Sequence, residues 1–421
     1  MAERFAIAAG HVLPMNAAPI SEGAVIVSGD RIEAVIPRGE LPSGLPCGEH
    51  PEGILMPAFV NAHTHLALTS YRGMADDADF FTWLTKFMIP LGMELDERTC
   101  RESARAGVRQ CFRHGITALG DCHFLPWGRE AMLESGMKGV TFFEVFGVRV
   151  LDLARSVARQ REEIEKLAKE ATDGVRVGVS PHAPYSVSPP MGRMAGEVAA
   201  KLDLPISIHV AETRDEVELF LHGRGRFAVI RTFVRLPIPD GSGTPLRYLD
   251  ELGLLTPRTL LVHGIHLSDS DLDIIAARGC TLVTCPTSNA KLAAGVARVG
   301  AWLRRGIPTC IATDSPASGE GYDLFEEMRR FILLQRGLTC EIGDLSAEQV
   351  LHMVTTTPAR ALGMAEMVGD LRAGSCADLV LVEPSRDQLS ENRDVYGTLV
   401  WGTRAQDIVA VWADGKEVYR R

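Results

Sequence analysis

The chain has 421 residues, 46% of them hydrophobic, with a formal net charge of −10. This length allows a large buried core, and the acidic balance without a basic, aromatic-rich stripe argues against a nucleic-acid partner. No apolar run reaches the length of a membrane span, the N-terminus lacks a signal-peptide pattern, and the nine cysteines form no CxxC pair. We therefore expect a soluble cytoplasmic protein with reduced thiols and no membrane partner.

Short β-rich segments lie at both ends of the chain. They are residues 5–8, 24–28 and 31–36 near the N-terminus, and 377–382, 408–413 and 416–418 near the C-terminus. Tight turns are expected at Gly29-Asp30 and Asp414-Gly415. Because neither group can bury a core alone, we expect residues 1–55 and 366–421 to pair into one small β-sandwich domain.

Between the two ends, short apolar runs alternate with longer helical patterns. The runs that read as strands are 54–60, 117–120, 139–145, 175–179, 206–210, 260–263, 281–285 and 309–312. The intervening helices include 97–114 and 155–170, and Ser346 is expected to cap a last helix. This alternation predicts an α/β fold, a (β/α)8 TIM-type barrel over residues 56–365, in which chemistry occurs at the carboxyl ends of the strands.

The connection after the expected strand 206–210 is unusually long. Its residues 222–246 are rich in glycine and proline. Such connections at a barrel mouth are typical of lids and equally of variable surface loops, and the sequence does not decide between them.

Two histidines separated by one residue follow the first apolar run of the barrel. In an extended backbone, the side chains of His63 and His65 point to the same side. Two such imidazoles can hold one divalent metal. The pair alone is weak evidence, since chance or a purely structural pair is the more common explanation.

More histidines and carboxylates leave later strands at the same face of the barrel. They are His182, His209, Glu212, His263 and Asp314. Burying so many polar groups without a metal or mutual pairing would be costly. Three imidazoles and one carboxylate suit zinc, with iron, manganese or nickel as alternatives. The expected ligands of one divalent metal ion are His63, His65, His209 and Asp314.

The remaining groups fit the roles that hydrolysis requires. Glu212, three residues beyond His209, can carry a proton between the attacking water and the leaving group. His263 and Asp314 can hydrogen-bond that water, whose pKa a bound metal lowers towards neutrality. No lysine lies between residues 175 and 188 to bridge two metals, so we expect a mononuclear site.

These motifs resemble the amidohydrolase superfamily, and within it the cytosine-deaminase-like and chlorohydrolase-like branch. The stretches that carry the resemblance are 60–66, 72–73, 83–84, 181–185, 209–213, 263–267, 285–292 and 313–318. They span the barrel in the family's order. The resemblance implies a mononuclear metal hydrolase with a small-molecule substrate, usually an aminohydrolase of an aromatic nitrogen ring, and gives the metal and catalytic residues the same roles.

Within that branch, the sequence is similar to deaminases of 5′-substituted adenosines, such as S-adenosylhomocysteine/methylthioadenosine and aminodeoxyfutalosine deaminases. The similarity implies that His182 and Trp83 face the substrate. Gly92 stands where the adenosylhomocysteine group has an acidic residue for the ribose, and Glu144 stands where it has an arginine. Together with the Gly-Arg-Gly loop at 223–225, these departures favour the aminodeoxyfutalosine type. We expect Arg72 and Glu144, with His182, to contact the sugar and its 5′ group; a surface or supporting role is the alternative for each.

Two other functions stay open at this point. A hydrolase of the same fold can act on another ring, as a triazine chlorohydrolase or aminohydrolase or as a guanine or cytosine deaminase, because pocket residues decide the substrate. A non-catalytic barrel that only binds a ligand is the third option. It would need no proton shuttle, so Glu212, His263 and Asp314 argue against it. The sequence leaves the oligomeric state open, a homo-oligomer included.

Overall fold

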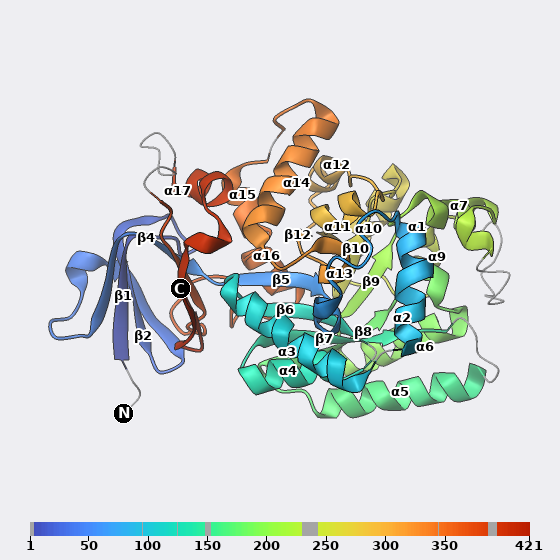
Figure 1. Ribbon diagram of the computed structural model, residues 1–421, viewed down its shortest axis with the longest axis horizontal. Helices are drawn as coiled ribbons and strands as arrows, with labels where there is room; N and C mark the ends of the chain where they lie inside the picture. Colours follow the sequence, from blue (N-terminus) through green and yellow to red (C-terminus); the bar gives the residue numbers. More distant parts are fainter. Residues whose placement is uncertain are drawn as a thin grey trace.

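The computed structural model describes residues 4–94, 96–123, 125–147, 153–229, 243–343, 345–385 and 394–421. Their strands form two sheets, an eight-stranded one with the order β12-β11-β10-β9-β8-β7-β6-β5 and a seven-stranded one with the order β15-β14-β13-β4-β1-β2-β3. Figure 1 shows the seven-stranded sheet at one end of the molecule, beside the larger helix-covered barrel. This arrangement confirms the expected fold class.

The barrel strands are the apolar runs expected from the sequence. They are β5 (Phe59–Thr64), β6 (Ile116–His123), β7 (Lys138–Val145), β8 (Val175–Pro181), β9 (Ile206–Val210), β10 (Thr259–His263), β11 (Thr281–Thr284) and β12 (Thr309–Ile311). Neighbouring strands pair in parallel. The ring closes where the Asn61 side chain bonds Thr313 and the Asp314 amide donates to the His63 carbonyl at 3.2 Å. All eight carboxyl ends therefore open at one face.

Helices cover the outside of the barrel (Figure 1). The main ones are α3 (Glu97–Arg113), α4 (Trp127–Ser135), α5 (Leu153–Lys169), α6 (Pro189–Leu202), α7 (Arg214–His222), α9 (Pro245–Glu251), α10 (Asp269–Arg278), α11 (Pro286–Lys291), α12 (Val299–Leu303), α14 (Leu324–Thr339), α15 (Ala347–His352) and α16 (Thr356–Ala361). The predicted helices at 97–114 and 155–170 are confirmed as α3 and α5. Ser346 accepts a hydrogen bond from the Gln349 amide and caps α15, as expected.

The terminal sheet joins the two ends of the chain. It consists of β1 (Arg4–Val12), β2 (Ile20–Ser28), β3 (Arg31–Pro37), β4 (Cys47–Pro57), β13 (Leu379–Val382), β14 (Ile408–Ala413) and β15 (Lys416–Arg420). The antiparallel pairing of β4 with β13 connects the N-terminal and C-terminal strands. Both expected turns have left-handed backbone, with φ of 62° at Gly29 and 49° at Asp414. The strands form one hydrogen-bonded sheet with its own apolar core.

The apolar run 54–60 was expected to be one barrel strand, and this is wrong. Its first half belongs to β4 and pairs with β13, while β5 begins at Phe59 and pairs with β6. Pro57 has no amide hydrogen to continue a ladder, and the chain crosses from one sheet to the other at Ala58, whose amide bonds the Asp378 carbonyl. The boundaries at 55/56 and 365/366 stay predictions.

Three further expectations concern loops, thiols and membranes. Of the long connection 222–246, residues 230–242 lie outside the described part of the chain. All nine cysteines are free thiols. Among the described residues, no helix is both long and apolar enough to cross a membrane.

Candidate active site

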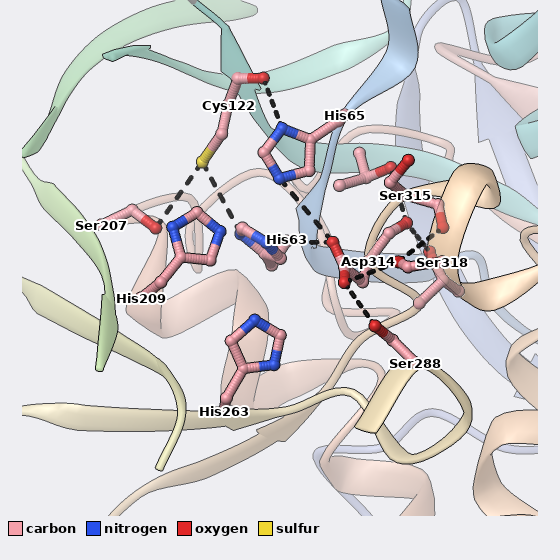
Figure 2. A network of polar contacts seen from close by, with 12 residues as sticks. His63, His65, Cys122, Ser207, His209, His263, Ser288, Asp314, Ser315 and Ser318 are labelled. Carbon is pink, nitrogen blue, oxygen red and sulfur yellow. Dashed lines mark hydrogen bonds and ion pairs between the residues drawn. The ribbon is translucent and has the colours of Figure 1, made fainter. Parts of the chain in front are cut away.

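Three imidazoles converge where β5 and β9 end. His63 lies within β5, His65 follows it directly, and His209 is the penultimate residue of β9. The ring centroid of His63 is 5.0 Å from that of His65 and 4.9 Å from that of His209. One ring nitrogen of each lies within 4.8 Å of the other two. Figure 2 shows the rings facing a common centre with Asp314.

The Nδ1 atom of each of these rings contacts a protein atom on the side away from the common centre. His65 Nδ1 lies 3.1 Å from the Cys122 carbonyl, and His209 Nδ1 lies 2.7 Å from the His182 carbonyl. His63 Nδ1 lies 3.6 Å from the Cys122 sulfur. A hydrogen on Nδ1 leaves Nε2 as the bare, electron-donating nitrogen of each ring.

Asp314 completes this group from the loop after β12. Its Oδ1 lies 3.5 Å from His63 Nε2 and 3.7 Å from His65 Nε2. Its Oδ2 accepts hydrogen bonds from Ser288 at 2.7 Å and Ser318 at 2.9 Å. Burial opposes ionisation, but His63 and the other nearby imidazoles hold the pKa of Asp314 well below its ordinary value.

This donor set fits a divalent first-row metal ion. His63 is fully buried, and its Nε2 has no hydrogen-bond partner among the described residues. A buried polar atom without a partner is costly, and a bound cation would satisfy it. Imidazole nitrogens with one carboxylate oxygen are the ligands that zinc and its neighbours prefer.

A second pair of titratable groups lies beside the centre. His263 Nε2 is 3.5 Å from Glu212 Oε1, and His263 Nδ1 is 2.8 Å from Asn289 Oδ1. Burial lowers the pKa of His263 to about 4, so the ring is neutral near pH 7 and its Nε2 can accept a hydrogen bond. Burial and the nearby Asp314 raise the pKa of Glu212 well above its ordinary value, so this carboxyl can hold a proton.

The backbone is left-handed at three positions at or just beyond the strand ends of this site. The φ angles are 49° at Ala211, 73° at His263 and 59° at Asp314. Non-glycine residues adopt this region rarely, and such strain is concentrated at functional sites. Glu216 stabilises the first of these turns by accepting the amides of Ala211 and Glu212, each at 3.0 Å.

A cavity of about 370 Å³ opens above the centre. Its outer wall is apolar and comes from a continuous helical segment, α1 (Phe80–Trp83), a π-helical turn η3 (Leu84–Met88) and α2 (Ile89–Glu94). Trp83 lines it and donates its indole N–H to the Ala317 carbonyl at 3.3 Å. His182 lines it too, tilted against Phe146 with ring centroids 4.7 Å apart.

Glu144 reaches the same cavity from β7. Its side chain is buried, and Oε1 has no partner among the described residues. One carboxylate oxygen lies within 4.8 Å of a ring nitrogen of both His182 and His209. Burial and the charges of Asp121 and Asp314 raise the pKa of Glu144 to about 8. This group lies beside the proposed metal centre rather than at the rim.

The structure does not bring Arg72 to this cavity. The short helix η2 (Leu66–Tyr71) leads the chain away from β5, and Arg72 donates to Gln110 Oε1 at 2.7 Å. Arg72 instead lines a separate, more polar cavity of about 630 Å³. The other candidates from the sequence lie at the metal centre or line the first cavity.

Several supporting residues carried no predicted role. They are Cys122, Glu216, Ser288, Asn289 and Ser318, and each hydrogen-bonds a candidate residue or its backbone. Ser288, Asn289 and Ser318 lie inside the motifs 285–292 and 313–318, and this position could have indicated a role at the site. Cys122 and Glu216 lie in no such motif, and only the folded contacts identify them.

Comparisons with known proteins show what the whole chain is similar to. The model of the Amidohydrolase family matches residues 54–418. A 5-methylthioadenosine/S-adenosylhomocysteine deaminase of Pelotomaculum thermopropionicum is 33% identical over 95% of this chain and 89% of its own length. A 5′-deoxyadenosine deaminase of Methanothermobacter thermautotrophicus is 33% identical over 87% and 82%. The crystal structure of a Xanthomonas campestris adenosine deaminase with bound zinc has a TM-score of 0.87 at 27% identity, covering 98% of this chain and 92% of that one.

Proposed function

The chain belongs to the amidohydrolase family, and from that premise we propose that it hydrolytically deaminates the adenine of a 5′-substituted adenosine and releases ammonia. It is a hydrolase of carbon–nitrogen bonds other than peptide bonds. One observation carries the proposal: bare imidazole nitrogens and Asp314 converge beside Glu212 and His263 at the base of an apolar cavity.

The family uses a divalent metal ion, and the donor set of this chain fits one. We propose a single ion, most simply zinc, held by Nε2 of the three imidazoles and Oδ1 of Asp314. The zinc in the Xanthomonas campestris structure supports this choice, with iron, manganese or nickel as alternatives. When bound, such an ion acts as a Lewis acid and lowers the pKa of a water molecule towards neutrality.

The residues beside the ion would move the protons. His263, whose tautomer the Asn289 carbonyl sets, accepts a hydrogen bond from the attacking water through Nε2. Glu212 takes a proton from that water and delivers it to a ring nitrogen, for which its raised pKa is suited. The new C6–O bond forms and the C6–N bond to the amino group breaks. The amine takes the second proton of the attacking water, which Glu212 can also carry, and leaves as ammonia. The product is an inosine-type nucleoside.

The cavity walls would hold the nucleoside. Trp83 and its apolar neighbours provide a surface for the flat ring and the 5′ group, and His182 presents Nε2 because its Nδ1 is bonded to Ser186 at 2.8 Å. Glu144 is too close to the proposed ligand His209 to lie at the far end of a bound nucleoside. We propose that it contacts the heterocycle or the nearest sugar atoms.

The 5′ substituent is the open part of this proposal. Both sequence relatives are named for adenosine derivatives with methylthio, homocysteine or deoxy 5′ groups. The preference for aminodeoxyfutalosine expected from Gly92 and Glu144 remains a prediction. Gly92 lines the cavity without offering a side chain, so it provides no carboxylate for the ribose.

A substrate panel tests the function directly. Ammonia release is measured with adenosine, 5′-deoxyadenosine, methylthioadenosine, adenosylhomocysteine, aminodeoxyfutalosine, guanine, cytosine and a chlorotriazine. We expect turnover of at least one 5′-substituted adenosine, with ¹⁸O from labelled water at C6 of the product. Turnover of guanine or a chlorotriazine with none of any adenosine would overturn the proposal.

A further inference from the structure

Cys122 lies directly behind the proposed metal centre. It is the penultimate residue of β6, its exposed fraction is 3%, and its sulfur points towards the imidazoles (Figure 2). The residue is not a candidate ligand, because its sulfur faces Nδ1 of His63 rather than the bare Nε2 atoms. Its position raises the question of what it does for the rings in front of it.

One residue holds two of the three imidazoles. The Cys122 carbonyl lies 3.1 Å from His65 Nδ1, and the Cys122 sulfur lies 3.6 Å from His63 Nδ1. The thiol also donates to Ser207 Oγ at 3.8 Å, two residues before His209 on β9. Cys122 therefore contacts β5 and β9, the two strands that carry the proposed histidine ligands.

The anchors of the three rings differ in strength. His65 and His209 donate to backbone carbonyls, which are strong acceptors fixed by the strand ladders. His63 donates to a thiol sulfur, which is a weak acceptor on a rotatable side chain. Because the Cys122 thiol donates its hydrogen to Ser207, its sulfur lone pairs are free to accept from His63.

We propose that Cys122 is a positioning residue of the metal centre, whose sulfur accepts the His63 Nδ1–H and so directs His63 Nε2 towards the ion. His63 is the most completely buried of the three imidazoles and has no other partner for Nδ1 among the described contacts. Groups that orient a ligating histidine typically change metal affinity 10- to 100-fold when removed. This inference rests on the proposed ligand set.

Metal affinity of the purified full chain is the direct test. Metal-free protein is titrated with zinc against a chelator of known affinity. We expect Cys122→Ala to bind zinc roughly tenfold or more weakly than the wild type, whereas Cys122→Ser, which keeps an acceptor, stays within a few-fold. Cys310→Ala is the matched control, since Cys310 is a buried thiol of the same apolar cluster as Cys122 and no described hydrogen bond joins it to an imidazole.

Two further measurements separate positioning from packing. The Tm of each metal-free variant reports the loss of packing, and the increase in Tm on adding zinc reports binding at the site. We expect a smaller increase in Tm in Cys122→Ala than in the wild type, Cys122→Ser or Cys310→Ala. The visible absorption of the cobalt(II) protein should change in Cys122→Ala and resemble the wild type in Cys122→Ser. If Cys122→Ala fails to fold, Cys122→Val provides a similar volume without the acceptor.

Each result decides the matter. Wild-type affinity in Cys122→Ala, or equal weakening in the serine and alanine variants, would overturn the positioning role while leaving the proposed function intact. A wild-type protein that binds no zinc, cobalt, manganese or iron would instead overturn the proposed metal centre, and this inference with it.

Discussion

The two ends of the substrate cavity are built in different ways. At the metal end, imidazoles and carboxylates stand on strand ends, and backbone carbonyls, serine hydroxyls and left-handed turns hold them. The outer wall consists of Phe80, Trp83, Leu84 and Met88, which line the cavity through packing alone apart from one indole hydrogen bond. Hydrogen bonds to the backbone fix the positions of the side chains at the metal end. The packed side chains of the outer wall can be replaced by others of different size. We therefore expect the first region to carry the proposed chemistry and the second to select the substrate.

The outer wall has a support of its own. Phe227 is buried and lies 4.4 Å from Tyr185 and 6.4 Å from Phe80, ring centre to ring centre. The adjacent Arg226 bridges Asp79, which caps α1, at 2.5 Å and Asp215 of α7 at 2.7 Å. Residues 223–229 thus attach to the helical segment that lines the cavity. Variants at the two ends should separate chemistry from substrate binding.

Removing a proposed ligand should have the largest effect. We expect His63→Ala to lose tightly bound metal and to fall to background turnover, because only four ligands are available and the reaction depends on the ion. Elemental analysis and ammonia release measure the two losses, and we expect about one metal per wild-type chain. His352→Ala, on α15 outside the cavity, is the control. A metal-loaded, active His63→Ala would refute the ligand assignment.

Glu212→Gln should separate the proton shuttle from metal binding. The amide keeps the size of the side chain but cannot relay a proton, so kcat should fall by roughly two or more orders of magnitude while metal content stays unchanged. Glu218→Gln, at a half-exposed glutamate of the following helix α7 that pairs with Arg224, should behave as the wild type. Loss of metal from Glu212→Gln would make Glu212 a ligand instead.

Trp83→Ala should act on substrate binding and leave the metal end intact. Removing the indole from the cavity wall forfeits apolar contact, which we expect to raise KM by about tenfold. Metal content and the cobalt(II) spectrum should match the wild type. A fall in kcat with unchanged KM would show that the outer wall takes part in the chemistry. The two ends of the cavity would then not differ in function.

Arg226→Ala should give the smallest change. Its ion pairs are half-exposed and individually weak, so we expect KM to rise by about two- to fivefold, with kcat nearly unchanged; Arg224→Ala is the control. The hydrogen bond with Thr82 and then the one with Arg226 lower the pKa of Asp79 to about 2. The ion pair is therefore complete above the ordinary aspartate pKa and lost only as pH falls through about 2. The KM change should not vary between pH 5 and 8.

Much of the barrel was readable from local pattern. Runs such as 206–210 and 260–263 match β9 and β10, because a parallel strand buried on both faces needs an unbroken apolar stretch. The same rule gave the wrong result for the run 54–60, which is also an unbroken apolar stretch but is not a single strand. Two strands of different sheets are equally apolar, and the switch at Pro57 and Ala58 depends on which partner strand lies beside each half.

The sequence alone determined that His63, His65, His209, Glu212 and Asp314 gather at one face of the barrel, because they stand at strand ends and parallel strands bring their carboxyl ends together. The chemistry assigned to them is a proposal. Only the tertiary structure decided which groups support them and which residues share the cavity. The contact of His65 with the Cys122 carbonyl joins positions 57 residues apart in the sequence. Arg72 comes only seven residues after His65, yet it lines a different cavity. Periodicity records which side of its own strand a residue occupies, whereas distances between strands and the path of a loop depend on packing of the whole chain.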